Sequence, residues 1–241
     1  MTGVAIVIPM LNEAPSLPRL LRYLSLLDPA PREIIAVDGG STDHSIAIAQ
    51  AGGIRVITAA PGRGAAINVG VAAASAPLVC VLHADTLLPD DAIAVIAVTM
   101  ANPGLALASF LPLLSGPGGV RWGTSLHNWA KTYYGPLLFR PHLFLRGGRL
   151  LFGDHAMFFR RADFLAVGGC DARLLIMEDA DLCIRLTRLG RTRMVNRVVI
   201  SSDRRVAAWG AIRANLIYLR ISVSWAFGRR TKLDRHYPDV R

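Results

Sequence analysis

The stretch that decides the fold is Pro77-Leu78-Val79-Cys80-Val81-Leu82-His83-Ala84-Asp85-Thr86, an apolar run that ends in a single acid. A run of this length, followed by Pro89-Asp90-Asp91, is typical of a buried strand, a loop and then a helix start. Ligands of open α/β sheets bind beyond the carboxyl ends of the strands. Asp85 is therefore expected where a ligand binds, although an isolated acid here is more simply explained as a cap of the next helix.

Strand and helix patterns alternate on both sides of this stretch. Strands are expected at 4–8, 34–37, 54–57, 78–82 and near 105–111, and helices at 17–24, around 46–49, 62–74 and 90–100. Short joins between such elements are typical of a parallel sheet covered by helices. We therefore predict an α/β fold, a mostly parallel central sheet flanked by helices, with the first strand stopped by Pro9.

The alternation of strand and helix patterns stops after residue 114. A loop is expected at 115–119, and regular structure is expected to resume with a short strand at 152–159 and a helix at 162–167. The segment between them is basic and rich in aromatic residues from Trp122 to Phe144. This segment is either a lid over a bound substrate or part of the core.

Composition and charge limit the class of protein. With 241 residues, 52% hydrophobic and 18% charged, the chain is globular and most simply forms one domain with an appendage. Its net charge of +10 is uneven, because residues 92–153 and 204–233 contain no acid. We expect an anionic partner, a membrane surface or a phosphorylated acceptor, and no nucleic acid, since no nucleic-acid-binding module is recognisable.

The three cysteines lack metal-binding spacing and are expected to be core residues in a reducing compartment. No signal sequence is recognisable at the N-terminus. These features predict a cytoplasmic protein, and the basic half predicts that it works at the inner face of the membrane.

Polar residues follow three separate strands. They are Pro9-x-x-Asn12-Glu13, Asp38-Gly39-Gly40-Ser41-Thr42-Asp43 and His83-Ala84-Asp85. This set, in this order, resembles the family 2 glycosyltransferases with their GT-A nucleotide-sugar fold, over roughly residues 3–190. The resemblance implies that Pro9, Asn12 and Glu13 line a nucleoside pocket, and that Asp38, hydrogen-bonding the base, and Gly39 contact the nucleotide.

The segment Gly62-Arg63-Gly64-Ala65-Ala66-Ile67-Asn68 fits the same implication. Glycines let a backbone approach a diphosphate, a helix N-terminus favours anions, and Arg63 adds positive charge. Arg63, Gly64 and Asn68 are therefore expected on the nucleotide sugar.

Asp85 matches the second acid of the family's Asp-x-Asp metal motif. The resemblance implies that Ala84, next to it, also contacts the nucleotide sugar. The resemblance implies Mn²⁺ or Mg²⁺, which neutralises the charge of a leaving nucleoside diphosphate. His83 stands where the family has its first Asp. A histidine here can bind Mn²⁺ or contact a phosphate, and the sequence leaves both open.

Met177-Glu178-Asp179-Ala180-Asp181 matches the family's Glu-Asp pair, whose Asp is the general base. At 100° per residue, Asp179 points inward with Cys183, which favours a raised pKa. Glu178 and Asp181 fall on the polar face, with an Asp181–Arg185 pair expected at i,i+4. Asp154 and, as an alternative to a structural role, Glu178 are expected on the acceptor side.

The tail from Trp209 to Phe227 is apolar nearly all round but contains Arg213 and Arg220. Each would cost about 2.5–3.5 kcal/mol at the centre of a bilayer, so a spanning helix is not expected. Either an interfacial helix or a helix docked on the protein's own surface fits. We divide the chain into a GT-A domain, 1–203, with halves 1–114 for the nucleotide sugar and 115–203 for acceptor and catalysis, and a basic amphipathic tail, 204–241.

The sequence thus predicts an inverting glycosyltransferase that moves one sugar from a nucleotide-diphosphate sugar to an acceptor hydroxyl, lipid-linked or otherwise anionic. A nucleotidyltransferase of related fold is an alternative, but the Gly- and Lys-containing loop of such enzymes is missing after the first strand. A non-catalytic nucleotide-sugar-binding or membrane scaffold protein is the other, suggested by His83.

Overall fold

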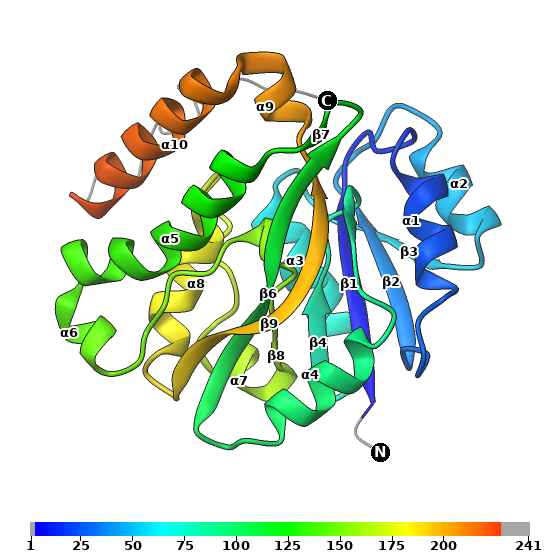
Figure 1. Ribbon diagram of the computed structural model, residues 1–241. Coiled ribbons are helices and arrows are strands. Elements are labelled where there is room, and N and C mark those ends of the chain that lie inside the picture. The colour runs from blue at the N-terminus through cyan, green and yellow to red at the C-terminus, as the bar shows by residue number, and fades with distance from the viewer. Residues whose placement is uncertain (1–2, 228–241) are drawn as a thin grey trace.

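The computed structural model describes residues 3–227 of the chain. The strands are β1 (Val4–Met10), β2 (Glu33–Asp38), β3 (Arg55–Thr58), β4 (Leu78–Val81), β5 (Thr86–Leu87), β6 (Leu105–Gly116), β7 (Gly119–Val120), β8 (Phe158–Arg160) and β9 (Arg191–Ser202). Within this range they form one sheet in the order β3-β2-β1-β4-β8-β6-β9-β5, with β7 paired to β6 (Figure 1).

Helices cover both faces of this sheet. They are α1 (Leu17–Leu24), α2 (Ser45–Ala51), α3 (Arg63–Ala73), α4 (Ala92–Met100), α5 (Trp122–Phe139), α6 (Pro141–Leu145), α7 (Arg161–Ala166), α8 (Glu178–Leu186), α9 (Arg204–Trp209) and α10 (Ala211–Ala226), with a 3₁₀ turn at Gly153–His155. The predicted α/β layering is confirmed.

The first four strands are all parallel, as predicted. β1 does not stop at Pro9 but runs to Met10, with Pro9 opposite Val37 of β2. Its pairing with β4 ends at Val7 and Val81. Alternate residues of β1 face each neighbour, so the nitrogen of Pro9 points to a side where no strand remains. The missing N–H therefore costs no ladder hydrogen bond.

The alternation of β1 divides the core into two layers. Val4, Ile6 and Ile8 pack on one face with α1 and α4, and Ala5 and Val7 pack on the other with α3. Successive side chains of a strand point to opposite faces, so a strand buried on both sides is apolar throughout. This explains why continuous apolar runs, and not alternating ones, predicted these strands correctly.

The second half of the sheet changes direction twice. β8 is antiparallel to both β4 and β6, and β9 is parallel to β6. β6 and β9 therefore run in the same direction as β4, and their carboxyl ends lie at the same edge of the sheet. The residues after β9 reach the edge that the sequence analysis assigned to the ligand.

The C-terminal helices dock on this framework. Ile221 and Trp225 of α10 belong to the core layer that also contains α3 and α8, and Val206 of α9 packs with Leu114 and Ala214. Of the two alternatives for the tail, docking is therefore found for one face of α10. No helix among residues 3–227 is long and apolar enough to cross a membrane. The end of the predicted tail, 228–241, lies outside the described residues.

Candidate active site

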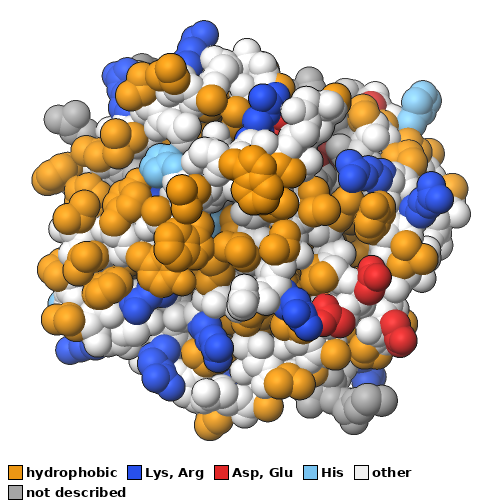
Figure 2. Space-filling model, in the orientation of Figure 1, with side chains coloured by type: hydrophobic (Ala, Val, Ile, Leu, Met, Phe, Trp, Pro, Cys, Tyr) orange, Lys and Arg blue, Asp and Glu red, His pale blue; other side chains and the backbone are white. Residues whose placement is uncertain are grey.

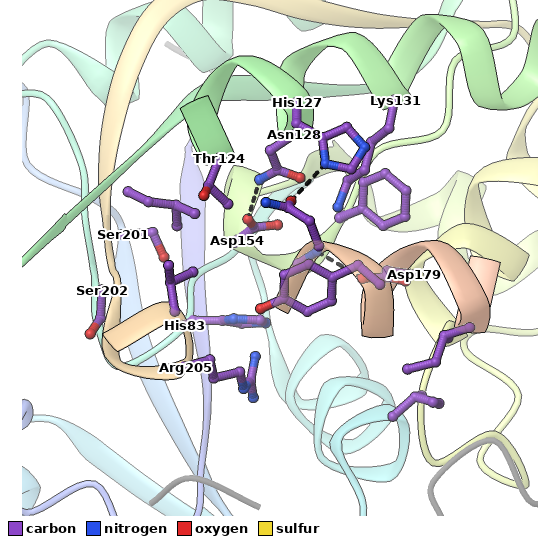
Figure 3. A pocket seen from close by; sticks show the side chains of 18 of the residues that line it. His83, Thr124, His127, Asn128, Lys131, Asp154, Asp179, Ser201, Ser202 and Arg205 are labelled. Carbon is purple, nitrogen blue, oxygen red and sulfur yellow. Dashed lines mark hydrogen bonds between the residues drawn. The ribbon is translucent and has the colours of Figure 1, made fainter. Parts of the chain in front are cut away.

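A pocket of about 130 Å³ lies at the carboxyl edge of the sheet. Five residues that the sequence analysis singled out line it: Arg63, His83, Asp85, Asp154 and Asp179. Figure 3 shows Asn128 and Lys131 reaching toward Asp154 from α5, with Asp179, His83 and Arg205 on other sides of the pocket. The fold thus brings together acids and cations that lie far apart in the sequence.

Asp179 lies at the buried start of α8. Its carboxylate accepts hydrogen bonds from the backbone N–H groups of Gly153 (2.8 Å) and Ala180 (2.7 Å). Burial, and next the negative charge of Glu178, raise the pKa of Asp179 to about 6, against the opposing effect of Arg63. A carboxyl group with a pKa near 6 can accept a proton at neutral pH more readily than an ordinary aspartate.

Asp154 is held by α5. The Asn128 amide donates to its carboxylate at 2.5 Å, and Nε2 of His155 lies 3.7 Å from its other oxygen. Burial alone would raise the pKa of Asp154, but the His155 ring, Lys131 and the Asn128 hydrogen bond bring it below its ordinary value. Asp154 is therefore an anion at neutral pH, unlike a group poised to exchange a proton.

Lys131 is the cation of this side of the pocket. Its ammonium lies 4.0 Å from the centre of the Phe152 ring and 5.6 Å from that of Tyr218. Burial lowers the pKa of Lys131, and Asp154 and Asp179 oppose that effect. The aromatic rings and the two acids together favour the charged form of the amine and oppose the effect of burial.

Arg63, expected on the diphosphate, forms an ion pair with Glu178 at the N-terminus of α3. Glu178 was predicted on a polar helix face, but its side chain is buried inside the protein. The pair expected between Asp181 and Arg185 is found: Arg185 donates to Asp181 at 2.8 Å. Glu178 therefore orients Arg63, which lines the pocket.

Arg204 joins two strand ends that were assigned to the donor. Its guanidinium makes two hydrogen bonds to Glu13 (2.9 and 2.7 Å) and lies 3.1 Å from Asp85. A second pocket of about 620 Å³ shares Asp85 and Arg204 with the first, and Ala84 lines it too. The Arg204 side chain thus lines both cavities.

His83 has a different environment from Asp85. A side chain on Gly153 would begin 2.4 Å from His83 Nε2, so the imidazole packs directly on the Gly153 backbone. Nε2 is buried and has no hydrogen-bond partner in the structure. Burial, and next the charge of Arg63, lower the pKa of His83 to about 3. His83 is therefore a neutral side chain at the base of the pocket.

The side chains available as metal ligands limit the kind of metal site that this pocket can form. No group of three or more His, Cys, Asp or Glu side chains with metal-site geometry occurs among the described residues. Asp85 offers one carboxylate, and Arg204 already contacts it. Mg²⁺ in nucleotide sites is commonly held by one or two carboxylates together with substrate phosphates. Asp85 fits a metal that arrives with a diphosphate, and does not fit one held by the protein alone.

The loops after β1 and β2 are tied to each other. Asn12 has a positive φ of 53°, its side-chain oxygen accepts from the N–H of Thr42 (2.8 Å), and its own N–H donates to Ser41 (2.9 Å). Asp38 accepts the N–H groups of Gly40 (2.9 Å) and Ser41 (3.0 Å). Pro9 and Gly39 lie at the ends of the same two strands. These contacts fix the shape of the predicted nucleoside pocket, while nucleotide contacts by these residues stay a prediction.

Asn68 and Gly64 have structural partners. The Asn68 side chain both donates to and accepts from the backbone of Cys170, at 2.9 and 2.7 Å. A side chain on Gly64 would begin 3.3 Å from Cys170 Cβ, so this glycine allows α3 to approach the same turn. Their contact with a donor also stays a prediction.

Several residues that line the pocket were missed by sequence reasoning, among them Asn128, Lys131, Arg204 and Arg205. A signal for the first two was present, since Thr124, Asn128 and Thr132 recur at the spacing of one helix face. The signal for the arginines was the end of β9, a strand that the sequence analysis did not identify.

Comparisons with known proteins agree on a family. The family model described as "Glycosyl transferase family 2" matches residues 5–167. The uncharacterized glycosyltransferase Rv0539 of Mycobacterium tuberculosis is 39% identical over 84 residues, which are 34% of this chain. The match covers only 37% of the length of that relative.

Two solved structures share the fold. A mannosyltransferase from Pyrobaculum calidifontis, in complex with GDP-Man and Mn²⁺, has a TM-score of 0.65 at 17% identity, covering 99% of this chain and 65% of its own. Glucosyl-3-phosphoglycerate synthase from M. tuberculosis, in complex with Mn²⁺, UDP and phosphoglyceric acid, has a TM-score of 0.64 at 22% identity. The match covers 94% of this chain and 79% of the synthase. Both support the GT-A fold predicted above. The family model matches more than half of the chain, and the chain therefore belongs to glycosyl transferase family 2.

Proposed function

We propose that the protein is an inverting glycosyltransferase that moves one sugar from a nucleotide-diphosphate sugar to an acceptor hydroxyl. The observation that carries this proposal is a buried carboxyl with a raised pKa, Asp179, in one pocket with Asp85 and with the cations Arg63 and Arg204. The pocket thus offers a proton acceptor together with groups that can neutralise a diphosphate. The two solved relatives bind GDP-Man and UDP with Mn²⁺, which supports a donor of the same class.

In the proposed reaction, Asp179 accepts the proton of the acceptor hydroxyl. The acceptor oxygen forms a bond to C1 of the sugar, and the bond from C1 to the diphosphate oxygen breaks on the opposite face. The anomeric centre is inverted, and the electron pair leaves with the nucleoside diphosphate. Asp154, which stays ionised, and Lys131 are placed to orient the sugar or the acceptor.

The negative charge of the leaving group is balanced by cations of the chain. Arg63 is held by Glu178, and Arg204 and Arg205 come from the start of α9. A divalent metal, Mn²⁺ or Mg²⁺, bound to Asp85 with the donor would supply further charge neutralisation. Pro9, Asn12, Glu13, Asp38 and Gly39 are proposed to bind the nucleoside, with Gly64, Asn68 and Ala84 nearby.

Donor binding requires Arg204 to move. Ligand pockets usually measure roughly 300–1,000 Å³, whereas the pocket containing Asp179 measures about 130 Å³. We propose that Arg204 exchanges its carboxylate partners for the diphosphate, which joins the two cavities. The site thereby keeps Glu13 and Asp85 neutralised until the donor arrives.

A thermal-shift panel of UDP-, GDP- and dTDP-sugars, each with and without Mn²⁺ or Mg²⁺, tests the donor class. A ligand at a hundredfold excess over its Kd should stabilise the protein by about 2.7 kcal/mol. We expect one nucleotide class to raise the melting temperature, more strongly with metal, and Asp85→Asn to remove the effect of the metal. A folded protein that responds to no member of the panel would contradict the proposal.

A further inference from the structure

Helix α5 has its polar side turned to the protein and its apolar side turned outward. Its buried residues are Thr124, Ser125, Asn128, Thr132 and Pro136. Its exposed large apolar residues include Trp122 (71%), Leu126 (64%), Trp129 (42%) and Leu137 (47%). The second set recurs at i, i+4, i+7 and i+15, which is one face of a helix. A helix of a globular protein normally shows the reverse arrangement.

Helix α10 lies beside α5 and carries a second apolar stripe. Its exposed apolar residues are Ile212 (80%), Leu216 (60%), Leu219 (46%) and Phe227 just after its end (75%). His127 of α5 hydrogen-bonds Asn215 of α10 at 2.7 Å, and the Phe139 and Phe227 rings lie 6.2 Å apart. We call the two stripes together the apolar face. Exposed patches of this kind usually mark an interaction site.

The charges around the apolar face are positive. Figure 2 shows hydrophobic side chains gathered over the region of α5, α6 and α10, with Lys and Arg at its borders. Arg213 and Arg220 flank the α10 stripe, and Arg146 follows α6. The acid-free segments 92–153 and 204–233 contain all these elements. A second copy of the chain would bring its own basic border against this one, so the charges disfavour self-association and favour an anionic partner.

We propose that the apolar face binds the surface of an anionic lipid bilayer, with α5 and α10 lying in the interface. Amphipathic helices with tryptophan on one side and basic residues at the border are suited to this position. The arginines would remain at the lipid headgroups, where each contributes electrostatic attraction. No described helix needs to cross the membrane for this binding.

The same two helices line the pocket with their inner sides, through Asn128 and Lys131 of α5 and Tyr218 of α10. Docking would therefore set the pocket beside the bilayer, and an acceptor hydroxyl on a lipid-linked molecule could reach Asp179 from there. This assignment of the acceptor rests on the function proposed above. The docking itself does not.

Flotation of the full chain with vesicles tests the proposal. We expect wild type to float with phosphatidylcholine–phosphatidylglycerol vesicles and to bind phosphatidylcholine alone much more weakly. Leu126→Glu combined with Leu216→Glu should weaken binding by about tenfold or more, because both substitutions put a charge into the apolar face. Arg213→Gln combined with Arg220→Gln should lose about fivefold for each charge on anionic vesicles only.

The control is Val98→Glu, on an apolar residue of α4 that is even more exposed (77%) and lies away from the apolar face. It should float as wild type does. The proposal would be overturned if the wild-type protein floats with neither kind of vesicle. It would also be overturned if the Leu126→Glu/Leu216→Glu variant floats as wild type does. A wild-type dimer that this variant dissociates in light scattering would also overturn it, by assigning the face to a second copy. Nucleotide binding is measured without vesicles, so failure of docking and failure of the proposed function are separate results.

Discussion

Helices α1 and α5 lie in the two halves of the molecule and expose opposite kinds of residue. α1 buries Leu17, Leu20 and Leu24 against the sheet and leaves its polar residues in solvent. α5 buries threonine, serine and asparagine and exposes tryptophan and leucine. The first half therefore builds a conventional core that fixes the strand ends. The second half builds a polar wall for a pocket and leaves its apolar side exposed.

This contrast predicts that substitutions in the two halves fail in different ways. Changes at the pocket wall and strand ends should affect chemistry and ligand binding. Substitutions of the core residues between the sheet and the helices of the first half should lower the stability of the fold.

Asp179→Asn should lower turnover by about a thousandfold, since general base catalysis is worth roughly 10²–10⁴ in rate. Donor binding should be retained, because the amide has nearly the same shape. The rate of nucleoside diphosphate release and calorimetric binding of the donor measure the two effects. Asp181→Asn, two residues away and paired with Arg185, is the control and should keep most of the turnover. Equal losses in both variants would point to a structural role for Asp179.

Turnover should also depend on pH through Asp179. The base must be ionised, so the rate should rise about tenfold per pH unit below a pKa of about 6 and level off above it. Burial, which raises this pKa, also makes the charged form unfavourable in the folded protein. The folded state binds the proton more tightly than the unfolded state, so stability falls as pH rises from the ordinary value of 3.8 to about 6.

Asp179→Asn should therefore stabilise the protein at pH 8 by about 2–3 kcal/mol and have little effect near pH 4. Denaturant unfolding at the two pH values measures this difference. An equal effect at both values would mean that the ionisation of Asp179 is not the cause.

Arg204→Gln should leave Glu13 and Asp85 without the cation that joins them. We expect a loss of stability of about 1–3 kcal/mol, below the full cost of breaking a buried pair because Arg204 is partly exposed. Arg197→Gln, which removes the exposed pair with Asp91, is the control and should cost at most about 1 kcal/mol. Similar losses in the two variants would remove the special place given to Arg204.

Gly70→Ala and Gly123→Ala compare the two halves directly. A side chain at Gly70 of α3 would begin 2.4 Å from Val7 and 2.9 Å from Val37, whereas nothing lies within 4 Å of one at Gly123 of α5. Gly70→Ala should destabilise by about 1–3 kcal/mol through overpacking. Gly123→Ala should be neutral or stabilise by up to about 1 kcal/mol through helix propensity. Thermal unfolding that ranks them in the reverse order would contradict the packing described for α3.

The difference between the halves also explains how far the sequence could be read. The parallel strands were predicted because residues buried on both faces form continuous apolar runs, as in β1 and β4. Asp179 lies inward with Cys183, as predicted from its direction on α8, but Glu178 and Asp181, predicted on a polar face, are buried as well.

Two elements of the second half could not be predicted from the sequence, because their burial does not follow their polarity. α5 was described as basic and aromatic but not recognised as a helix, because its apolar stripe does not face the core. β9 was missed since only alternate parts of it are buried. With β9 missing, Arg204 and Arg205 could not be placed at the ligand edge, and the pairing of Arg204 with two distant acids depends on that placement.

The most direct test of the proposed donor site follows Mn²⁺ by electron paramagnetic resonance, which reports the free ion. The nucleotide that stabilises the protein is titrated with Mn²⁺ into wild type and Asp85→Asn. We predict that wild type takes up the ion only together with the nucleotide, and that Asp85→Asn weakens this uptake by about tenfold or more. Unchanged uptake by Asp85→Asn would place the donor elsewhere and contradict the site described here.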